Sequence, residues 1–240
     1  MSPELLGLVV TVGITLLSGV VYVVSGAYRR EDQNEIGDRG TFLLGSFVRS
    51  WLYWFLGPVE RLAVGLKLSP STFNILGVAL GVSAGFCFGI GNLNSGGWLI
   101  LLSGAVDVLD GRIARAQGLA SRRGAFLDST LDRFAEVGAF VGLAVFYRDS
   151  VALTIVVVLA MGGSLLVSYT RARGESLGVV CNAGIMQRAE RILLVGLGGI
   201  LDPILGFEVG LILASCLIIL AAGVMGTAVY RTIWISTRIL

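Results

Sequence analysis

Long apolar stretches and short polar segments alternate along this chain of 240 residues. Most apolar stretches are about 20 residues long, the length of helix that crosses the hydrocarbon core of a bilayer. A membrane β-barrel would instead show short stretches of alternating polarity. The pattern predicts an all-α integral membrane protein, with spans over residues 5–27, 72–91, 96–117, 125–147, 151–173, 187–204 and 207–230.

The region between the first two predicted spans has a mixed character. Residues 29–40 (RREDQNEIGDRG) predict a polar connector, whereas residues 41–67 mix apolar and charged side chains and contain Pro58, where we expect the helix to break. Three aromatic residues suit the headgroup level of a bilayer and predict an interfacial juxtamembrane helix: Trp51, Tyr53 and Trp54. The expected organisation is an extra N-terminal transmembrane helix, a connector with this interfacial helix, and a six-helix domain, over residues 1–28, 29–68 and 69–240.

Lysine and arginine gather in alternate connections between the predicted spans. The segment 29–67, the turn 112–123, the region 171–191 and the C-terminal end are basic, whereas the intervening turns hold one arginine among them. Basic loops stay on the cytoplasmic side of a membrane. We therefore expect a multi-pass protein of the plasma membrane, with its N-terminus outside and its C-terminus inside.

Composition narrows the chemistry. Charged residues make up 14% of the chain, against about 25% in soluble domains, and the 34 glycines suit close helix packing in lipid. The net charge of +2 is too small to indicate nucleic-acid binding. Histidine is absent, which excludes Ser-His-Asp and Cys-His catalysis and imidazole metal ligands. The three cysteines lie far apart without CxxC spacing and are interpreted as small buried hydrophobic residues.

Four aspartates interrupt the apolar pattern around the turn between the third and fourth predicted spans: Asp107, Asp110, Asp128 and Asp132. Ionised carboxylates are costly in an apolar environment, and several together repel one another unless cations hold them. On two antiparallel helices joined by a short turn, their spacing places them on facing sides near the cytoplasmic surface. The alternative is that they pair with the arginines of the turn. Glycines on both acidic faces, Gly111 and Gly124, leave room for a ligand and favour a binding site.

Carboxylates at these spacings predict a metal centre. Four of them can hold two divalent ions, and two such ions can clamp a diphosphate. Oxygen ligands indicate Mg²⁺, Mn²⁺ or Ca²⁺. Arg115, one turn beyond Gly111, is placed to contact phosphate oxygens.

The pattern D-x2-D-G-x2-A-R-x8-G-x3-D-x3-D, which runs from Asp107 to Asp132, resembles the complete signature of the CDP-alcohol phosphotransferases. The resemblance covers roughly residues 42–235. It implies a six-helix transmembrane bundle in a homodimer that displaces CMP from a CDP-linked lipid by a second alcohol. It also implies two divalent ions, Mg²⁺ or Mn²⁺, held by Asp107, Asp110, Asp128 and Asp132, with Asp132 also as general base. The implied CDP-binding residues are Asp107, Asp110, Gly111, Ala114, Arg115 and Gly124.

One element departs from that family's pattern. The family often has P-N-x-x-T just before the second span, whereas here Pro70 is followed by Ser71 and then Asn74. Nucleotide contacts from this element are therefore in doubt.

Arginines near the ends of the later spans bear on the acceptor. They lie in S-Y-T-R-A-R, in Q-R-A-E-R and at the end of the last span. Single arginines at helix ends often anchor to the interface, but as a group these suit a doubly charged phosphate. The segments resemble the phosphatidylinositol-phosphate synthases of the family, although Arg171 stands where lysine is usual. The resemblance implies these acceptor-phosphate residues: Arg171, Arg173, Arg191 and Arg231, with Arg188 either among them or supporting the loop.

We therefore expect phosphatidyl transfer from CDP-diacylglycerol to a phosphorylated alcohol, inositol phosphate, on the cytoplasmic side. One alternative is phosphatidylglycerol-phosphate synthesis, with glycerol 3-phosphate as acceptor. A divalent-metal transporter and a catalytically silent scaffold are alternatives of other classes; against transport, the acids lie at one membrane face. Glu136, one turn past Asp132, is interpreted as a structural residue that orients Arg133 or Arg115.

Overall fold

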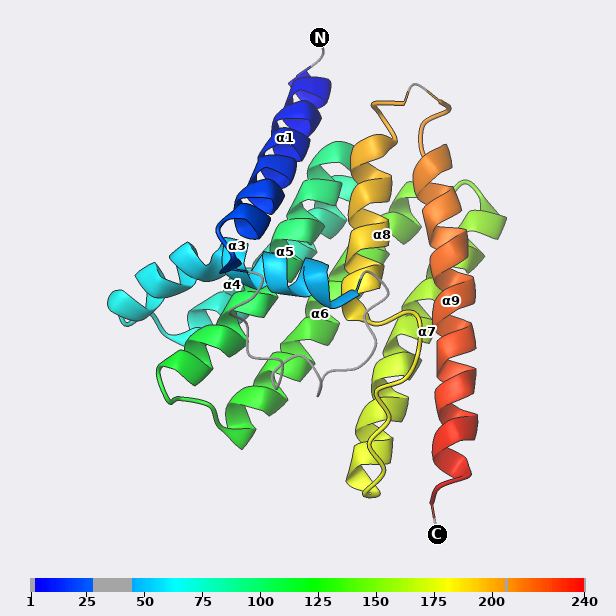
Figure 1. Ribbon diagram of the computed structural model, residues 1–240. Helices are drawn as coiled ribbons and strands as arrows, with labels where there is room; N and C mark the ends of the chain where they lie inside the picture. Colours follow the sequence, from blue (N-terminus) through cyan, green and yellow to red (C-terminus); the bar gives the residue numbers. More distant parts are fainter. Residues whose placement is uncertain (1–2, 28–44, 206, 240) are drawn as a thin grey trace.

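The computed structural model describes residues 3–27, 45–205 and 207–239, and within them the regular structure is helical (Figure 1). The polar connector predicted for residues 29–40 lies outside the described residues. The helices are α1 (Pro3–Val24), α3 (Gly45–Gly65), α4 (Pro70–Gly89), α5 (Leu93–Ala116), α6 (Arg122–Phe146), α7 (Val151–Ser176), α8 (Arg188–Leu201) and α9 (Leu211–Ser236).

Polar residues at the helix starts explain why most helices begin before the predicted spans. Pro70 opens α4, where its fixed φ suits the first turn. The Asn92 Oδ1 accepts a hydrogen bond from the Ser95 amide at 3.2 Å, and the Ser121 Oγ accepts one from the Gly124 amide at 3.1 Å. Such side chains satisfy amides that have no partner within the helix. Spans predicted from apolar residues alone leave out these first turns, because the turns contain polar residues.

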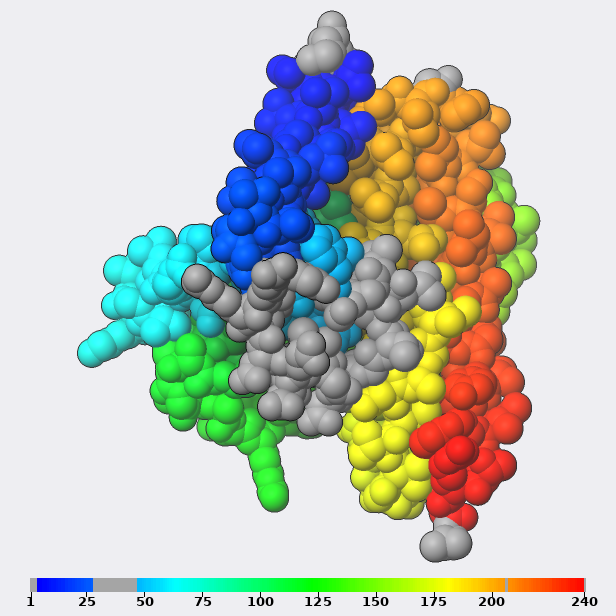
Figure 2. All heavy atoms as spheres, viewed as in Figure 1, coloured from blue at the N-terminus to red at the C-terminus, as the bar shows by residue number. Residues whose placement is uncertain are grey.

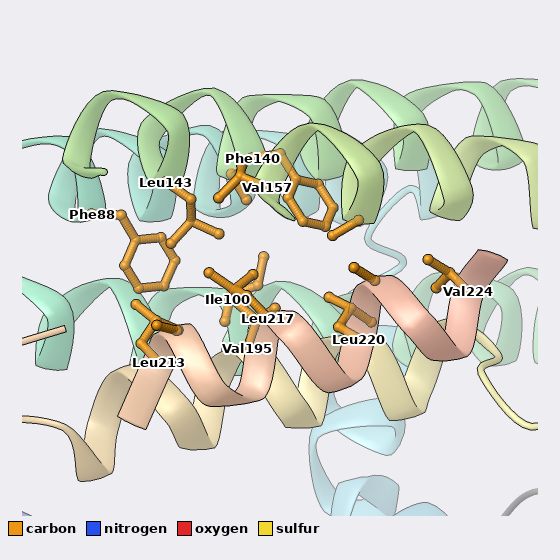
Figure 3. Packing of buried hydrophobic residues seen from close by; sticks show 14 of the residues in the cluster. Phe88, Ile100, Phe140, Leu143, Val157, Val195, Leu213, Leu217, Leu220 and Val224 are labelled. Carbon is orange, nitrogen blue, oxygen red and sulfur yellow. The ribbon is translucent and has the colours of Figure 1, made fainter. Parts of the chain in front are cut away.

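Six helices form the main bundle, as predicted. Helix α4 packs against α5 and α6, α7 packs against α9, and α8 contacts both α5 and α9. Buried side chains from all six meet in one core (Figure 3). Its labelled members include Phe88, Ile100, Phe140, Leu143, Val157, Val195, Leu213, Leu217, Leu220 and Val224.

Glycines let α4 and α6 approach backbone to backbone. A Cβ atom on Gly85 would collide with the Gly138 carbonyl, and one on Gly142 would collide with the Gly85 carbonyl. Small residues of this kind are typical of helix contacts in lipid. The expectation of close packing is confirmed at this contact, which holds α6 against α4.

The protein is a multi-pass membrane protein, but its helices are not equally suited to cross a bilayer. Among the described residues, four are long and apolar enough by length and composition: α1, α4, α7 and α9. Helices α5 and α6 carry charged residues at the ends that meet in the acidic site. Helix α8, with 14 residues, rises only about 21 Å, less than the hydrocarbon core of about 30 Å. The count of seven spans therefore stays a prediction.

Helix α3 lies crosswise to the long helices of the bundle (Figure 1). It continues through Pro58, so the expectation of a break there is wrong. A proline removes one backbone hydrogen bond from a helix. Buried contacts on both sides of the proline, from Leu56 and Ala63 to Leu109 and Ile113 of α5, hold the two halves in line.

Helix α1 stands on the outside of the bundle (Figure 2). Its carboxyl end is attached to α3: the Trp51 Nε1 donates to the Ser18 Oγ at 3.1 Å, and the buried Tyr22 ring lies 5.5 Å from that of Trp54. Most of its apolar side chains, such as Leu16 and Leu17, are exposed. That surface suits contact with lipid, in line with the extra transmembrane helix expected from the sequence.

A buried aspartate caps the start of α9. The Asp202 carboxylate accepts hydrogen bonds from the Gly210 amide at 2.7 Å and the Leu213 amide at 3.0 Å, and the residue is 1% exposed. Asp202→Ala would leave both buried amides without an acceptor. We expect it to lower the free energy of unfolding by on the order of 3 kcal/mol. Thermal unfolding in detergent would measure this, with Glu208→Gln, an exposed change in the same loop, as control. An unchanged unfolding temperature for Asp202→Ala would contradict the capping role.

Candidate active site

The turn between α5 and α6 sets the acidic residues face to face. Helix α5 ends at Ala116, Gly118 reverses the chain with φ of +67°, and Ser121 caps α6. Both helices pack closely against α4. Their acidic faces therefore meet beside α4, as the sequence pattern predicts.

Three of the four aspartates form a cluster. One carboxylate oxygen from each of Asp107, Asp110 and Asp128 lies within 4.8 Å of the other two. Asp110 is buried and the other two are half-buried. A narrow cavity of about 10 Å³ lies against them, room for one small ion or water. Oxygen-only donors of this charge fit a hard divalent cation such as Mg²⁺ or Mn²⁺.

The fourth aspartate has a different partner. Asp132 lines the same narrow cavity, but its carboxylate forms an ion pair with Arg188 of α8. The Arg188 Nη1 also lies 3.3 Å from the Asp107 Oδ1. One arginine therefore neutralises the side of the site that faces α8. The structure brings all four aspartates to one cavity, with Asp132 outside the three-carboxylate cluster.

A larger cavity adjoins the acidic one. It has a volume of about 540 Å³ and shares Asn74, Asp110 and Asp128 with the narrow cavity. Its lining includes five of the six residues predicted to bind CDP: Asp110, Gly111, Ala114, Arg115 and Gly124. Asp107, also predicted to bind CDP, lines the narrow cavity instead. Ser71 and Asn74, from the element that departs from the family pattern, line the large cavity too.

The two glycines of this cavity differ in the room that they leave for a side chain. A Cβ atom on Gly111 would lie 3.4 Å from the Arg115 Nη1, and one on Gly124 would lie 3.2 Å from the Ser121 Oγ that caps α6. A Cβ atom at position 124 would therefore crowd the cap, whereas one at position 111 would be in ordinary van der Waals contact with the end of the arginine. Glycine at both positions keeps this part of the cavity lining free of side chains.

Helix α3 braces the acidic end of α5. The Arg112 Nε donates to the Glu60 Oε2 at 2.6 Å, and the Arg112 guanidinium lies 4.7 Å from the centre of the Tyr53 ring. Arg112 follows Asp110 and Gly111 directly. The brace therefore acts within one helical turn of the carboxylate cluster. Tyr53 packs on an arginine here rather than serving only as a headgroup anchor.

The five predicted acceptor arginines fall into two groups. Arg171 and Arg173 are exposed near the end of α7 and contact neighbours on the same helix: the Arg171 Nε lies 2.8 Å from the Glu175 Oε1, and the Arg173 Nη1 lies 3.3 Å from the Ser176 Oγ. The other three lie deeper. Arg188 is half-buried beside the aspartates.

Arg231 is buried and bonded to the backbone. Its Nε donates to the Ala183 carbonyl at 2.7 Å and its Nη1 donates to the Val167 carbonyl at 2.8 Å. Arg231 thus ties α9 to α7 and to the loop before α8. Its predicted contact with an acceptor phosphate stays a prediction.

Glu136 joins two arginines. Its Oε2 lies 2.8 Å from the Arg133 Nη1, and its Oε1 lies 2.8 Å from the Nε of the buried Arg191. The predicted contact with Arg133 is confirmed. The contact with Arg191 was missed, because the two residues are far apart in the chain and on different helices. In the sequence, the one indication of this contact is the position of Glu136 on the acidic face of the helix, where its second oxygen needs a partner.

Known proteins that resemble this chain include phosphatidylinositol phosphate and archaetidylinositol phosphate synthases. Residues 67–234 match the family model of the CDP-alcohol phosphatidyltransferases. A phosphatidylinositol phosphate synthase from Streptomyces avermitilis is 38% identical over 161 residues, which cover 65% of this chain and 66% of that protein. One from Mycobacteroides abscessus is 36% identical over 178 residues, 72% of this chain and 80% of that protein. An archaetidylinositol phosphate synthase from Methanothermobacter thermautotrophicus is 32% identical over 181 residues, 75% of this chain and 90% of that protein.

Solved structures agree in fold. The phosphatidylinositol phosphate synthase of Mycobacterium tuberculosis with CDP-DAG bound superposes with a TM-score of 0.68 at 28% identity, covering 74% of this chain and 92% of that one. The same enzyme in complex with manganese and citrate gives a TM-score of 0.69 at 28% identity, covering 75% and 88%. The family model spans most of the chain, and its acidic signature converges on one cavity. The chain therefore belongs to the CDP-alcohol phosphatidyltransferase family and is a membrane-bound transferase.

Proposed function

We propose that this protein transfers the phosphatidyl group of CDP-diacylglycerol to a hydroxyl of inositol phosphate and releases CMP. The observation that carries the proposal is the position of the three-carboxylate cluster between a nucleotide-sized cavity and the arginines of α8. Donor and acceptor can then approach the cluster from different sides. The names of the relatives support inositol phosphate as the acceptor.

Asp107, Asp110 and Asp128 would hold a divalent ion, Mg²⁺ or Mn²⁺, and Asp132 would share in a second once Arg188 moves off its carboxylate. Bound there, such ions would neutralise the diphosphate and stabilise CMP as a leaving group. The manganese complex of the M. tuberculosis enzyme supports a divalent ion in this fold. The chain supplies a donor set of hard oxygens without histidine or thiolate.

The large cavity would hold the CDP group. Gly111 and Gly124 keep it open, Ala114 lines it, and Arg115 is placed to bind a phosphate oxygen. Asp110 and Asp128 border both cavities, so a diphosphate bound here would lie against the carboxylate cluster. Positioned donors and cations lower the barrier most where charge develops during the reaction.

Asp132 would act as the general base. It lies on α6 one turn beyond Asp128 and lines the cavity beside the cluster. Its proposed role is to take the proton of the acceptor hydroxyl as the oxygen attacks the phosphorus that carries the lipid. Arg188 fixes the carboxylate against α8. The acceptor phosphate would lie on the arginine side: Arg171, Arg173, Arg188, Arg191 and Arg231.

The wider organisation is proposed on the same basis. The divisions at 1–28, 29–68 and 69–240 are supported by the family match over residues 67–234. The start of α1 and the end of α9 lie at opposite ends of the molecule (Figure 1), which supports termini on opposite sides of the membrane. With the basic connections inside, the N-terminus would be outside and the C-terminus inside the plasma membrane, with the site facing the cytoplasm. A homodimer is proposed from the family resemblance.

Acceptor preference tests the proposed function. Purified protein with CDP-diacylglycerol and Mg²⁺ is given inositol phosphate, glycerol 3-phosphate or free inositol, and CMP release is measured. We expect inositol phosphate to give the highest kcat/KM, by at least about tenfold. Faster turnover with glycerol 3-phosphate would assign phosphatidylglycerol-phosphate synthesis instead. Turnover with free inositol but not with its phosphate would refute the role of the arginines.

A further inference from the structure

One carboxylate, Glu136, is shared between two arginines beside the proposed catalytic base. Its side chain is 14% exposed, and its two oxygens each lie 2.8 Å from a guanidinium nitrogen, one of Arg133 and one of Arg191. Arg133 belongs to α6 and Arg191 to α8. Together with the ion pair of Asp132 and Arg188, this bridge joins α6 to α8 at the level of the site.

One guanidinium nitrogen of Arg191 lacks a hydrogen-bond acceptor among the described residues. Its Nε donates to Glu136 and its Nη1 lies 3.4 Å from the Met186 carbonyl. Its Nη2 is buried and has no hydrogen-bond partner among the residues that the structure describes. The residue is 3% exposed and lines a cavity between α5, α6 and α8 together with Arg188. A buried guanidinium nitrogen without an acceptor is costly, and an anionic ligand would supply the missing acceptor.

Arg133 links the same carboxylate to the base and to α7. Its Nη1 also donates to the Ser168 Oγ, at 2.5 Å, and its Nη2 lies 3.8 Å from the Asp132 Oδ2. Ser168 is the first residue of the S-Y-T-R-A-R segment. Glu136 therefore connects the base on α6, the basic segment on α7 and Arg191 on α8.

We propose that Glu136 is a positioning residue, which orients the Arg191 guanidinium toward the acceptor phosphate. Through Arg133 and Ser168 it also fixes the position of Arg191 relative to Asp132. The inference rests on the proposed function only in requiring a phosphorylated acceptor. Glu136 would not contact substrate. Its effect is to orient one guanidinium so that the acceptor hydroxyl reaches the base.

Glu136→Gln is the sharpest test because it keeps the shape of the side chain. A carboxylate accepts from both arginines, whereas an amide offers one acceptor oxygen and turns its NH₂ toward the other guanidinium. One of the two bonds becomes a contact between two donors. The Arg191 side chain then loses its fixed orientation.

We expect Glu136→Gln to raise the KM for the phosphorylated acceptor by about tenfold or more, the size typical of a lost charge-assisted hydrogen bond. The KM for CDP-diacylglycerol and the affinity for Mn²⁺ should stay within about twofold of wild type, because Glu136 belongs neither to the three-carboxylate cluster nor to the lining of the large cavity. Glu208→Gln, a charge removal at the other end of the bundle, serves as the matched control and should change neither KM.

A double-mutant cycle distinguishes an effect of Glu136 through Arg191 from a general effect on the structure. In an Arg191→Gln background, Glu136→Gln should raise the acceptor KM no further, because the residue through which it acts is gone. Additive effects in the cycle would overturn the inference, as would an unchanged acceptor KM or an equal rise in both KM values. If Glu136→Gln does not fold, Ser168→Ala decides the matter: an acceptor KM raised about threefold supports the network, and an unchanged one overturns it.

The outcomes also separate this inference from the proposed function. Wild-type activity with glycerol 3-phosphate rather than inositol phosphate would overturn the acceptor assignment, and the variant series is then run with that acceptor. Wild-type activity with free inositol alone would overturn both. Normal wild-type use of inositol phosphate with an unaffected Glu136→Gln variant would overturn only the role of Glu136.

Discussion

Asp110→Asn is expected to lower kcat/KM for CMP release by roughly a hundredfold or more, because a lost metal ligand removes about 3 kcal/mol of transition-state stabilisation. Asp110 is the buried member of the carboxylate cluster, 5% exposed, and it borders both the acidic cavity and the large cavity. The amide keeps the size of the side chain but removes its charge. Mn²⁺ affinity, measured by titration in detergent, should fall with the activity.

Asp149→Asn is the control for that loss. Asp149 is exposed, lies beyond the far end of α6, and pairs only loosely with Arg148, at 3.8 Å. The substitution removes the same charge at a distance from the site, so activity and Mn²⁺ affinity should match wild type. Full activity of Asp110→Asn would show that the cluster does not hold the catalytic metal. A parallel loss in both variants would point to charge-dependent folding instead.

Asp132→Asn should have an equally large effect with a different signature. Loss of a general base costs about 10²–10⁴-fold in rate, and we expect that loss in kcat, with the KM for CDP-diacylglycerol little changed. Mn²⁺ affinity should fall less than in Asp110→Asn, because Asp132 lies outside the three-carboxylate cluster and is paired with Arg188. Single-turnover measurement of CMP release at saturating substrates isolates this step.

Two outcomes would contradict the assignment of Asp132. A kcat within about tenfold of wild type would exclude it as the base. A loss of Mn²⁺ affinity as large as that of Asp110→Asn would make it chiefly a metal ligand. In either case Arg188 would be the counter-ion of a carboxylate with another role.

The sequence predicts the bundle and the acidic site well because both follow from local spacing. Seven apolar stretches became helices α1 and α4–α9, with ends shifted by a few residues where capping side chains such as Asn92 and Ser121 extend them. The turn between α5 and α6 is short, so helical periodicity alone brings Asp107, Asp110 and Asp128 together. The glycine signature likewise maps onto one cavity.

Contacts across the bundle are what the sequence does not predict. The pairs of Asp132 with Arg188 and of Glu136 with Arg191 join α6 to α8, and no periodic pattern relates residues so far apart. Arg231 illustrates the same limit, because no pattern in the sequence indicates its hydrogen bonds to the Ala183 and Val167 carbonyls. Pro58 was misjudged because tertiary packing on α5 outweighs one lost hydrogen bond.

The central claim, that phosphatidyl transfer is directed to inositol phosphate, is tested most directly by competition. Purified protein with CDP-diacylglycerol and Mg²⁺ is given equal concentrations of inositol phosphate and glycerol 3-phosphate, and the lipid products are identified by mass. The account predicts phosphatidylinositol phosphate as the main product, in equal amount to the CMP released and absent in EDTA. Phosphatidylglycerol phosphate as the main product would contradict it.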